Sequence, residues 1–267
     1  MKIVTETERK EISVEILSDF DRICRKYGIT YYLAYGTLIG AVRHKGFIPW
    51  DDDIDVWIPI HQIEKLFEHL RQESKYQLID HFKDTNWVWP FSKLVDTRTI
   101  DIDIDSTRYE ALQTQRGQAI DLFPLLKVES IDSATIVEMQ KCEKKIEILF
   151  KYEKGFFDKN IPKKLFCEGL KAVRKDTNYY RKKIYELELS CKDGKLSGYP
   201  FSPYQMKDFH TTKAFEPTEL EFEGKRFMAP SGYDEILTNI YGDYMTLPPK
   251  DKQVTRHLSY QTYWKEG

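Results

Sequence analysis

Hydrophobic residues along the chain follow two different periods. Apolar side chains recur every three or four positions in residues 6–27 and 60–70, which predicts two amphipathic helices. Gly28 and Pro59 fit the end of the first helix and the start of the second. Continuous or alternating apolar runs predict short strands at residues 31–35, 53–58, 76–80, 87–95, 99–105 and 118–125. Strands interleaved with helices in this way predict an α+β fold, a mixed sheet flanked by helices.

One of these runs, residues 99–105, alternates isoleucine and aspartate after its first threonine. The pattern is typical of a half-buried strand with its isoleucines inward and Asp101, Asp103 and Asp105 outward. The two D-x-D pairs also suggest a second metal site, but an outward acidic row equally discourages edge-to-edge pairing of strands. We favour the structural interpretation of this run.

The composition of the sequence changes after residue 127. Residues 131–192 are rich in Lys and Glu and carry two helical stripes, which predicts a helical subdomain at 128–197 beside a core at 1–127. The first stripe comprises Ile136, Met139, Ile146, Leu149 and Phe150, and the second Leu165, Leu170, Val173, Tyr180, Ile184, Leu187 and Leu189. An excess of lysine in this subdomain suggests a basic face for an anionic partner or a membrane surface, with an ordinary solvated helix surface as the alternative.

Residues 198–267 form a third segment, predicted to pack back on the core. The Glu-Gly-Lys sequence within residues 221–228 predicts a hairpin. Ser231 and Asp234 have the spacing of a capping pair for a helix that ends at Tyr241, before Gly242.

Composition excludes several classes of protein. Hydrophobic residues make up 41% of the 267 residues, and the net charge is −2, which indicates a globular chain without the basic excess of a nucleic-acid-binding protein. The four cysteines are widely spaced, so we expect them to be reduced packing residues. The N-terminal residues lack the apolar region of a secretory signal, and no run approaches the ~18 apolar residues of a membrane span. We therefore expect a cytoplasmic protein, either free or associated with the membrane.

Candidate chemistry is concentrated in residues 35–59. Asp51, Asp52, Asp53 and Asp55 place four carboxylates within five residues, and such a group repels itself unless a cation lies among them. On a strand, Asp53 and Asp55 would share one face and bind a hard divalent cation together. A solvated acidic turn is the alternative.

A second candidate charge lies in the run of residues 118–125. Asp121 is a single carboxylate within the apolar sequence Ala-Ile-Asp-Leu-Phe. A buried, unpaired carboxylate is costly unless it meets a cation, which favours a ligand role; a helix cap or the end of a strand is the alternative.

The block from Tyr35 to Asp55 resembles the LicD family, phosphocholine transferases of bacterial cell-surface polysaccharides that are distantly similar to fukutin and fukutin-related protein. Its pattern is G-T-L-x-G-A-x-R-H-x-G-x-I-P-W-D-x-D-x-D. The matching residues are Gly36, Thr37, Leu38, Gly40, Ala41, Arg43, His44, Gly46, Ile48, Pro49, Trp50, Asp51, Asp53 and Asp55. The resemblance implies a nucleotidyltransferase-type fold, with Gly36 and Thr37 at the donor phosphates. It also implies Mg²⁺, one or two ions with Mn²⁺ as an alternative, on Asp53, Asp55 and Asp121.

The same resemblance extends to further candidates. Arg43 is expected to stabilise charge in the reaction, and His44 and Trp50 to contact the substrate. Lys93 precedes a family-like L-x-D-x-R-T element and could reach the donor, although a lysine at a sheet edge explains it equally well. Asp243 lies in a family-like Y-G-D element and could line the acceptor side, whereas a helix stop is the alternative.

The implied reaction is transfer of a phospho-substituent from a CDP-activated donor to a sugar hydroxyl of a lipid-linked or polymeric cell-surface glycan, with release of CMP. Phosphocholine is the first expectation for the donor group, and CDP-ribitol or CDP-glycerol are alternatives. True nucleotidyl transfer and a non-catalytic glycan-binding scaffold are the rival functions. A choline group would need an aromatic box, for which the sequence offers Tyr31, Tyr32, Trp50, Trp57, Trp87 and Trp89.

Overall fold

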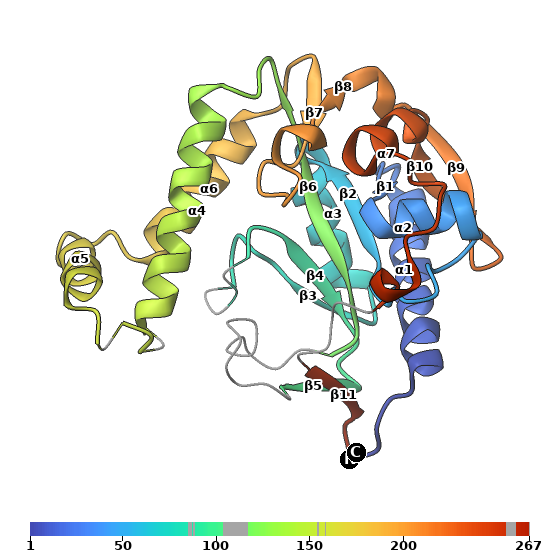
Figure 1. Ribbon diagram of the computed structural model, residues 1–267, viewed down its shortest axis with the longest axis horizontal. Helices are drawn as coiled ribbons and strands as arrows, with labels where there is room; N and C mark the ends of the chain where they lie inside the picture. Colours follow the sequence, from blue (N-terminus) through green and yellow to red (C-terminus); the bar gives the residue numbers. More distant parts are fainter. Residues whose placement is uncertain are drawn as a thin grey trace.

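A computed structural model describes residues 1–84, 87, 89–103, 117–153, 155–157, 159–254 and 260–266. The fold is α+β, as predicted, with a seven-stranded mixed sheet and two separate two-stranded sheets (Figure 1). The helices are α1 (Glu6–Tyr27), α2 (Tyr35–Ile39), α3 (Ile60–Glu73), α4 (Ala134–Glu153), α5 (Ile161–Ala172), α6 (Thr177–Ser190) and α7 (Tyr233–Tyr241). A π-helical turn, η1 (Gly40–His44), and three 3-10 turns, η3 (Gln205–Asp208), η4 (Thr212–Phe215) and η5 (Lys250–Lys252), complete the helical elements of the described residues.

The strands are β1 (Tyr32–Leu33), β2 (Asp55–Pro59), β3 (Gln77–Ile79), β4 (Ser92–Val95), β5 (Thr99–Asp103), β6 (Ala119–Val128), β7 (Leu196–Gly198), β8 (His210–Thr211), β9 (Pro217–Phe222), β10 (Lys225–Pro230) and β11 (Tyr260–Trp264). In the large sheet the order is β1-β2-β6-β4-β3, and β7 and β8 continue it from the far end of β6. Strands β2 and β6 run parallel, and the other pairs are antiparallel. The central strand β6 therefore has β2 on one side and β4 on the other.

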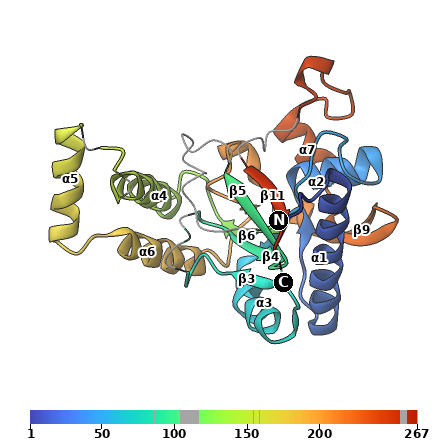
Figure 2. The ribbon, with the colours of Figure 1, turned by 90° about the horizontal axis from the view of Figure 1, so that it is seen from below.

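Helices α1 and α3 cover one face of this sheet, where both contact β6 (Figures 1 and 2). Helix α1 begins with a capping box between Thr5 and Glu8 and ends at Gly28, which has a left-handed backbone with φ 62°. The five residues predicted for the stripe of α3 are all buried: Ile60, Ile63, Leu66, Phe67 and Leu70. Because both helices bury an apolar stripe against the same face, the sheet is held with α1 and α3 on one side and the rest of the chain on the other.

The helical subdomain contains three helices, although the sequence predicted two long segments. The predicted second segment is broken between Val173, which caps the end of α5, and Asp176, whose side chain accepts from the N–H of Tyr179 at the start of α6. The first predicted stripe is buried in α4. Leu165 and Val173 of the second stripe are instead exposed, because α5 lies at the outer edge of the subdomain (Figure 2). A second small core holds this region together: Cys142, Ile146, Leu149, Phe150, Phe157, Cys167, Tyr180 and Ile184.

Two local predictions need correction, although the β9–β10 hairpin forms as expected. Helix α7 begins after Gly232 without a side-chain cap, so Ser231 and Asp234 do not form the expected pair. The carboxylate of Asp234 instead accepts from the hydroxyl of Tyr244 at 2.7 Å. This bond ties the segment that follows α7 to the first turn of the helix.

The alternating run also differs from its prediction. Strand β5 pairs with β11 away from the main sheet, and Ile102 is 39% exposed, so it does not face the core. Asp101 instead accepts a 2.7 Å hydrogen bond from the buried hydroxyl of Thr262. The buried face of this strand pair is the one that carries Thr99, Asp101 and Thr262, since Thr99 is 1% and Thr262 0% exposed, so Ile102 on the other face points outward. Asp105 lies outside the described residues.

The two termini lie side by side, because the main chain of Val4 and Lys2 bonds to β11 (Figure 1). Along the described parts of the chain, no helix combines the length and apolar character needed to cross a bilayer.

Candidate active site

A cavity of about 710 Å³ is lined by residues from the core, from the helical subdomain and from the C-terminal segment. Its volume falls in the range of sites for nucleotide-sized ligands. Five of the predicted metal-binding and substrate-binding residues line it: Gly36, Trp50, Asp53, Asp55 and Asp121. Asp51 lines it as well, so one wall of the cavity is strongly acidic.

The acidic wall is created by the register of the central strands. Asp55 at the start of β2 lies directly beside Asp121 on the parallel strand β6. The N–H of Asp121 donates to the carbonyl of Ile54 at 2.8 Å, which continues the pairing one residue further. Asp53 comes from the loop immediately before β2 rather than from the strand itself. Residues 66 positions apart in the sequence are thus brought together by one parallel ladder.

Burial and electrostatic repulsion both disfavour negative charge at this wall. Burial raises the pKa of Asp55 well above its usual range, and the neighbouring charges of Asp53, Asp121 and Asp51 raise it further. The ammonium group of Lys93 has the opposite effect on the pKa of Asp55. Binding of a cation among these carboxylates would relieve the repulsion.

Lys93 is held against the carboxylates by the other neighbour of β6. In the antiparallel β4–β6 pair Lys93 lies opposite Asp121, and its ammonium group forms an ion pair with that carboxylate. The same ammonium lies 5.6 Å from the ring centre of Phe91. Lys93 is therefore within the site's charge network, although it is not among the described residues that line the cavity.

Gly36 and Thr37, which the resemblance places at the donor phosphates, lie inside a helix. The expected strand at 31–35 is only Tyr32–Leu33, and α2 already begins at Tyr35. The hydroxyl of Thr37 is buried and accepts from the N–H of Asp55 at 2.9 Å, so it orients the first residue of β2. A Cβ on Gly36 would lie 2.4 Å from the carboxylate of Asp51, so only glycine leaves room for this close approach.

The remaining predicted site residues lie elsewhere. Arg43 donates to the ring of His44 at 2.9 Å and also to the carbonyl oxygen of Tyr244, and neither Arg43 nor His44 is among the described lining residues. Partial burial lowers the pKa of Arg43 and of His44. Asp243 is exposed and accepts from the hydroxyl of Thr246 at 2.7 Å in a local turn.

Asp52 is also separated from the cavity. It forms a buried ion pair with Arg9 of α1. This pair, together with the 3.1 Å bond from Arg9 to the side chain of Gln118, ties α1 to the loop that carries the acidic run.

An aromatic wall, opposite in character to the acidic one, was not predicted as a unit. Its rings form a continuous series, with ring centres 4.7 Å apart for Phe91 and Phe123 and 5.1 Å apart for Phe123 and Tyr199. Tyr199 in turn lies 5.5 Å from Phe201. The other aromatic lining residues are Tyr35, Trp50, Trp89, Tyr204 and Tyr241. Of the six aromatics proposed from the sequence, only Trp50 and Trp89 line the cavity, and Tyr31 and Trp57 are buried in the core.

Two charged lining residues were also missed. Glu143 of α4 reaches the cavity, and burial, then the nearby Glu147, raises the pKa of its carboxyl. Lys252 of η5 is the one cation among the described residues that line the cavity. Nothing distinguished Glu143 from the other acids of a Lys- and Glu-rich helix. The concentration of Pro, Tyr and Phe after residue 198 was the available signal for the aromatic wall.

Tyr35 and Asp208 form a buried pair at the base of the aromatic wall. The hydroxyl of Tyr35 donates to the carboxylate of Asp208 at 2.7 Å. Burial raises the pKa of Asp208 to about 7 against the effect of this hydrogen bond. Tyr35 has φ 44°, which is unusual for a residue with a side chain, and its ring lies 5.4 Å from Phe123. The backbone at the start of α2 is thus held in a strained form by its contacts.

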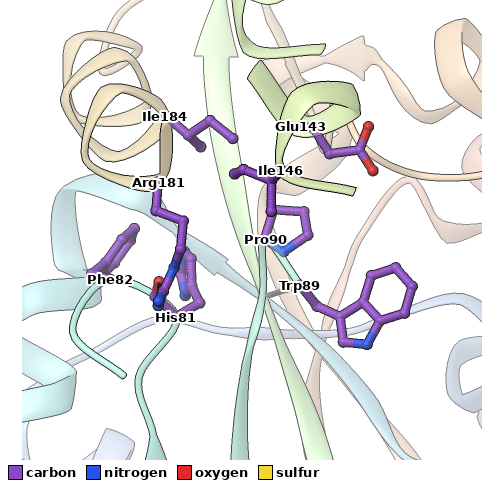
Figure 3. A pocket seen from close by; sticks show the side chains of 8 residues that line it. All are labelled: His81, Phe82, Trp89, Pro90, Glu143, Ile146, Arg181 and Ile184. Atoms are coloured by element: carbon purple, nitrogen blue, oxygen red, sulfur yellow. Dashed lines mark hydrogen bonds between the residues drawn. The ribbon is translucent and has the colours of Figure 1, made fainter. Parts of the chain in front are cut away.

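A smaller pocket behind Trp89 marks the junction between helical subdomain and sheet (Figure 3). Arg181 of α6 donates to the carbonyl oxygen of His81 at 2.8 Å, and the His81 ring lies 3.5 Å from the carboxylate of Glu188. Burial lowers the pKa of His81 and raises that of Glu188, so both groups favour their neutral forms. Glu143 and Trp89 point to one side of this junction, away from His81 and Arg181 (Figure 3).

The carboxylates fit a hard divalent cation by their chemistry. Asp53, Asp55 and Asp121 offer only oxygen ligands, which suit Mg²⁺ or Mn²⁺. Five acidic residues and one lysine among the described lining residues would repel an anionic ligand unless a cation accompanied it. In the part of the chain that the structure describes, no three His, Cys, Asp or Glu side chains already form a metal-binding group, and Asp121 is paired with Lys93.

Comparisons with known proteins agree with this architecture. Residues 28–161, half of the chain, match the LicD/FKTN/FKRP nucleotidyltransferase domain. The match covers strands β1, β2, β3, β4 and β6 of the main sheet and every carboxylate of the acidic wall, which defines the core as a nucleotidyltransferase-type domain.

A relative from Haemophilus influenzae extends the similarity to 97% of the chain. The sequence is 29% identical over 271 residues to the lipopolysaccharide cholinephosphotransferase LicD of Haemophilus influenzae, covering 97% of this chain and 98% of that protein. It is 36% identical over 62 residues to the human ribitol 5-phosphate transferase FKRP, which is 23% of this chain and 12% of that protein. The chain belongs to the LicD family and is a phosphotransferase.

Proposed function

We propose that this protein transfers phosphocholine from CDP-choline to a sugar hydroxyl of a cell-surface glycan in a Mg²⁺-dependent reaction that releases CMP. The observation that carries the proposal is the division of one cavity into an acidic wall and an aromatic wall. The first suits a metal-bound diphosphate, and the second suits a quaternary ammonium group. The whole-length similarity to a cholinephosphotransferase supports the same donor.

The acidic wall would bind the diphosphate of the donor through metal. Asp53, Asp55 and Asp121 are the residues that would hold Mg²⁺, which when bound neutralises the diphosphate and the departing CMP oxygen. Lys252 adds a positive charge at the same cavity, and Lys93 keeps Asp121 oriented through its ion pair. The predicted roles of Arg43, His44 and Asp243 remain predictions, since these side chains lie off the described cavity wall.

The reaction itself requires little covalent chemistry from the protein. The acceptor hydroxyl oxygen forms a bond to the phosphorus that carries choline, the bond from that phosphorus to the bridging oxygen breaks, and CMP leaves. The hydroxyl proton passes to one of the carboxylates Asp53, Asp55 or Asp121. Catalysis then rests on positioning and on neutralisation of charge.

The aromatic wall would select the donor group. Trimethylammonium has no hydrogen-bond donors, so it is recognised by aromatic faces and by a nearby negative charge. Phe91, Phe123, Tyr199 and Trp89 supply the faces, and Glu143 supplies the charge. A ribitol or glycerol group would need several hydroxyl partners in place of these rings. The partial similarity to a ribitol 5-phosphate transferase keeps CDP-polyols as the alternative donors.

The acceptor would be a lipid-linked or polymeric glycan. We place the reaction in the cytoplasm, at the inner membrane surface where such glycans are assembled. True nucleotidyl transfer would use the same carboxylates but would release pyrophosphate from its donor.

The experiment that tests the proposal measures CMP release by the purified chain with Mg²⁺ and each of CDP-choline, CDP-glycerol and CDP-ribitol. We expect CDP-choline to turn over fastest, and Asp53→Asn and Asp121→Asn to reduce the rate by at least about a hundredfold, since each removes a charge from the metal site. Asp193→Asn, at an exposed position outside the cavity, is the matched control. Preference for a polyol donor would contradict the choline assignment, and full activity of both variants would contradict the metal site.

A further inference from the structure

Helix α5 exposes an apolar face that the rest of the protein does not cover. It lies at the outer edge of the helical subdomain, where it packs beside α4 (Figures 1 and 2). Cys167 of α5 is completely buried, whereas Ile161 is 66% and Leu165 61% exposed. The exposed large hydrophobic residues of this helix and its flanks are Phe156, Ile161, Leu165, Phe166 and Val173.

Four of these residues, all except Phe156, lie on one face of the helix. At 100° per residue, positions 161, 162, 165, 166, 169, 172 and 173 fall within an arc of about 140° on the helix. Every one of these positions is exposed, and the buried Cys167 lies on the opposite side. Scattered exposed hydrophobics are ordinary, but a whole helix face of them marks a surface that meets something apolar. We call the surface of these seven positions the α5 face.

Basic residues outnumber acidic ones around the α5 face. Residues 151–175 contain eight lysines and arginines and three acidic residues. Lys159, Lys163, Lys171, Arg174 and Lys175 are exposed, and within the described residues Lys171 of this group pairs with the carboxylate of Glu153. An amphipathic helix with an apolar face and a basic margin is the type that lies in the interface of an anionic bilayer.

We propose that the α5 face docks on the surface of a membrane containing anionic lipids. A second copy of the chain fits less well, because stacking two α5 faces would bring their basic margins together. The purpose of docking, to present the cavity to lipid-linked acceptors, rests on the function proposed above, but the docking surface itself does not. Helix α4 connects the two features, since it carries Glu143 into the cavity and packs against α5.

The test is flotation of the full-length protein with vesicles, without donor or acceptor. Vesicles of phosphatidylcholine with about one-third phosphatidylglycerol are compared with vesicles of phosphatidylcholine alone. We expect binding to the anionic vesicles only, and a loss of about tenfold or more for Leu165→Ser/Phe166→Ser and for Arg174→Glu/Lys175→Glu. Leu247→Ser, which removes an exposed leucine of the C-terminal segment, is the matched control and should bind as the wild type does.

Several outcomes would overturn the proposal. The first is that the wild type does not bind the vesicles, and the second is that both α5 variants bind them as well as the wild type does. The third is that light scattering shows a dimer, which the Leu165→Ser/Phe166→Ser variant abolishes. The charge variant keeps the test decisive if the apolar variant fails to fold, and circular dichroism reports folding. CMP release from the soluble donor is measured in parallel, because inactive protein that still binds vesicles would contradict the proposed function and leave the docking surface intact.

Discussion

Asp121 shows how much one position depends on its neighbours. Its carboxylate lies beside Asp55 on one side and is paired with Lys93 on the other, so it joins the proposed metal ligands to the lysine that balances their charge. Glu143 is a second carboxylate of the cavity whose role depends on its neighbours, in this case the aromatic wall. Its partial burial among rings makes a positive ligand group the natural partner of its charge.

We expect Glu143→Gln to raise the KM for CDP-choline about tenfold and to leave the KM for CDP-glycerol nearly unchanged, because the removed charge faces only a cationic donor group. The measurement is CMP release against donor concentration. Glu147→Gln, one helical turn away and outside the cavity lining, serves as the control. An equal rise for both donors would show that Glu143 supports the cavity wall without contacting choline.

At the scale of elements, the helical subdomain is joined to the sheet through buried polar groups as well as apolar packing. Arg181 of α6 reaches the main-chain carbonyl of His81, and Glu188 of the same helix faces the His81 ring. His81 follows β3, and the Oγ of Ser92 at the start of β4 lies 2.6 Å from its ring nitrogen Nδ1. The hydrogen bond from Arg181, together with the bond that holds His81 to Ser92, therefore links α6 to β4, the strand that carries Lys93.

Replacing Arg181 by leucine should weaken this junction by about 1–3 kcal/mol, since a buried carbonyl loses its charged donor. In hydrogen exchange, we expect the Arg181→Leu variant to exchange faster than the wild type in α4 and α6. The rates in β2 and β6 should change less, because the sheet keeps its own hydrogen bonds. Lys182→Leu, at a position pointing to solvent, is the control. Uniform acceleration across the whole chain would contradict a local junction.

At the scale of the whole molecule, the main sheet concentrates acidic charge in one cavity although the protein is close to neutral overall. Repulsion among these carboxylates opposes folding unless a cation compensates their charge. Stability and ligand binding are then linked, because a metal that binds only the folded state adds to its stability.

We expect saturating Mg²⁺ to raise the midpoint of thermal unfolding by several degrees, corresponding to about 2–3 kcal/mol at one hundred times the dissociation constant. EDTA should reverse the shift. Differential scanning calorimetry of Asp53→Asn and of the exposed control Asp193→Asn separates site binding from general ionic effects. A shift of the same size in Asp53→Asn would argue against the acidic wall as the site.

The sequence by itself determined the α+β class, helices α1 and α3, the β9–β10 hairpin and the family to which the chain belongs. These features depend on local periodicity, on turn residues and on a contiguous block of residues 35–55, all of which can be read along the chain. Asp121 was found in the same way, because one charge in an apolar strand is visible without a structure.

Only the tertiary structure decided how distant segments share one cavity. The helical start at Tyr35, the pairing of Lys93 with Asp121 and the approach of Glu143 to the aromatic wall depend on strand register and helix packing, which leave no local pattern. The exposure of Leu165 and Val173 also depends on tertiary packing. A helical stripe predicts an apolar face, but whether that face is buried is decided by the elements that pack against it.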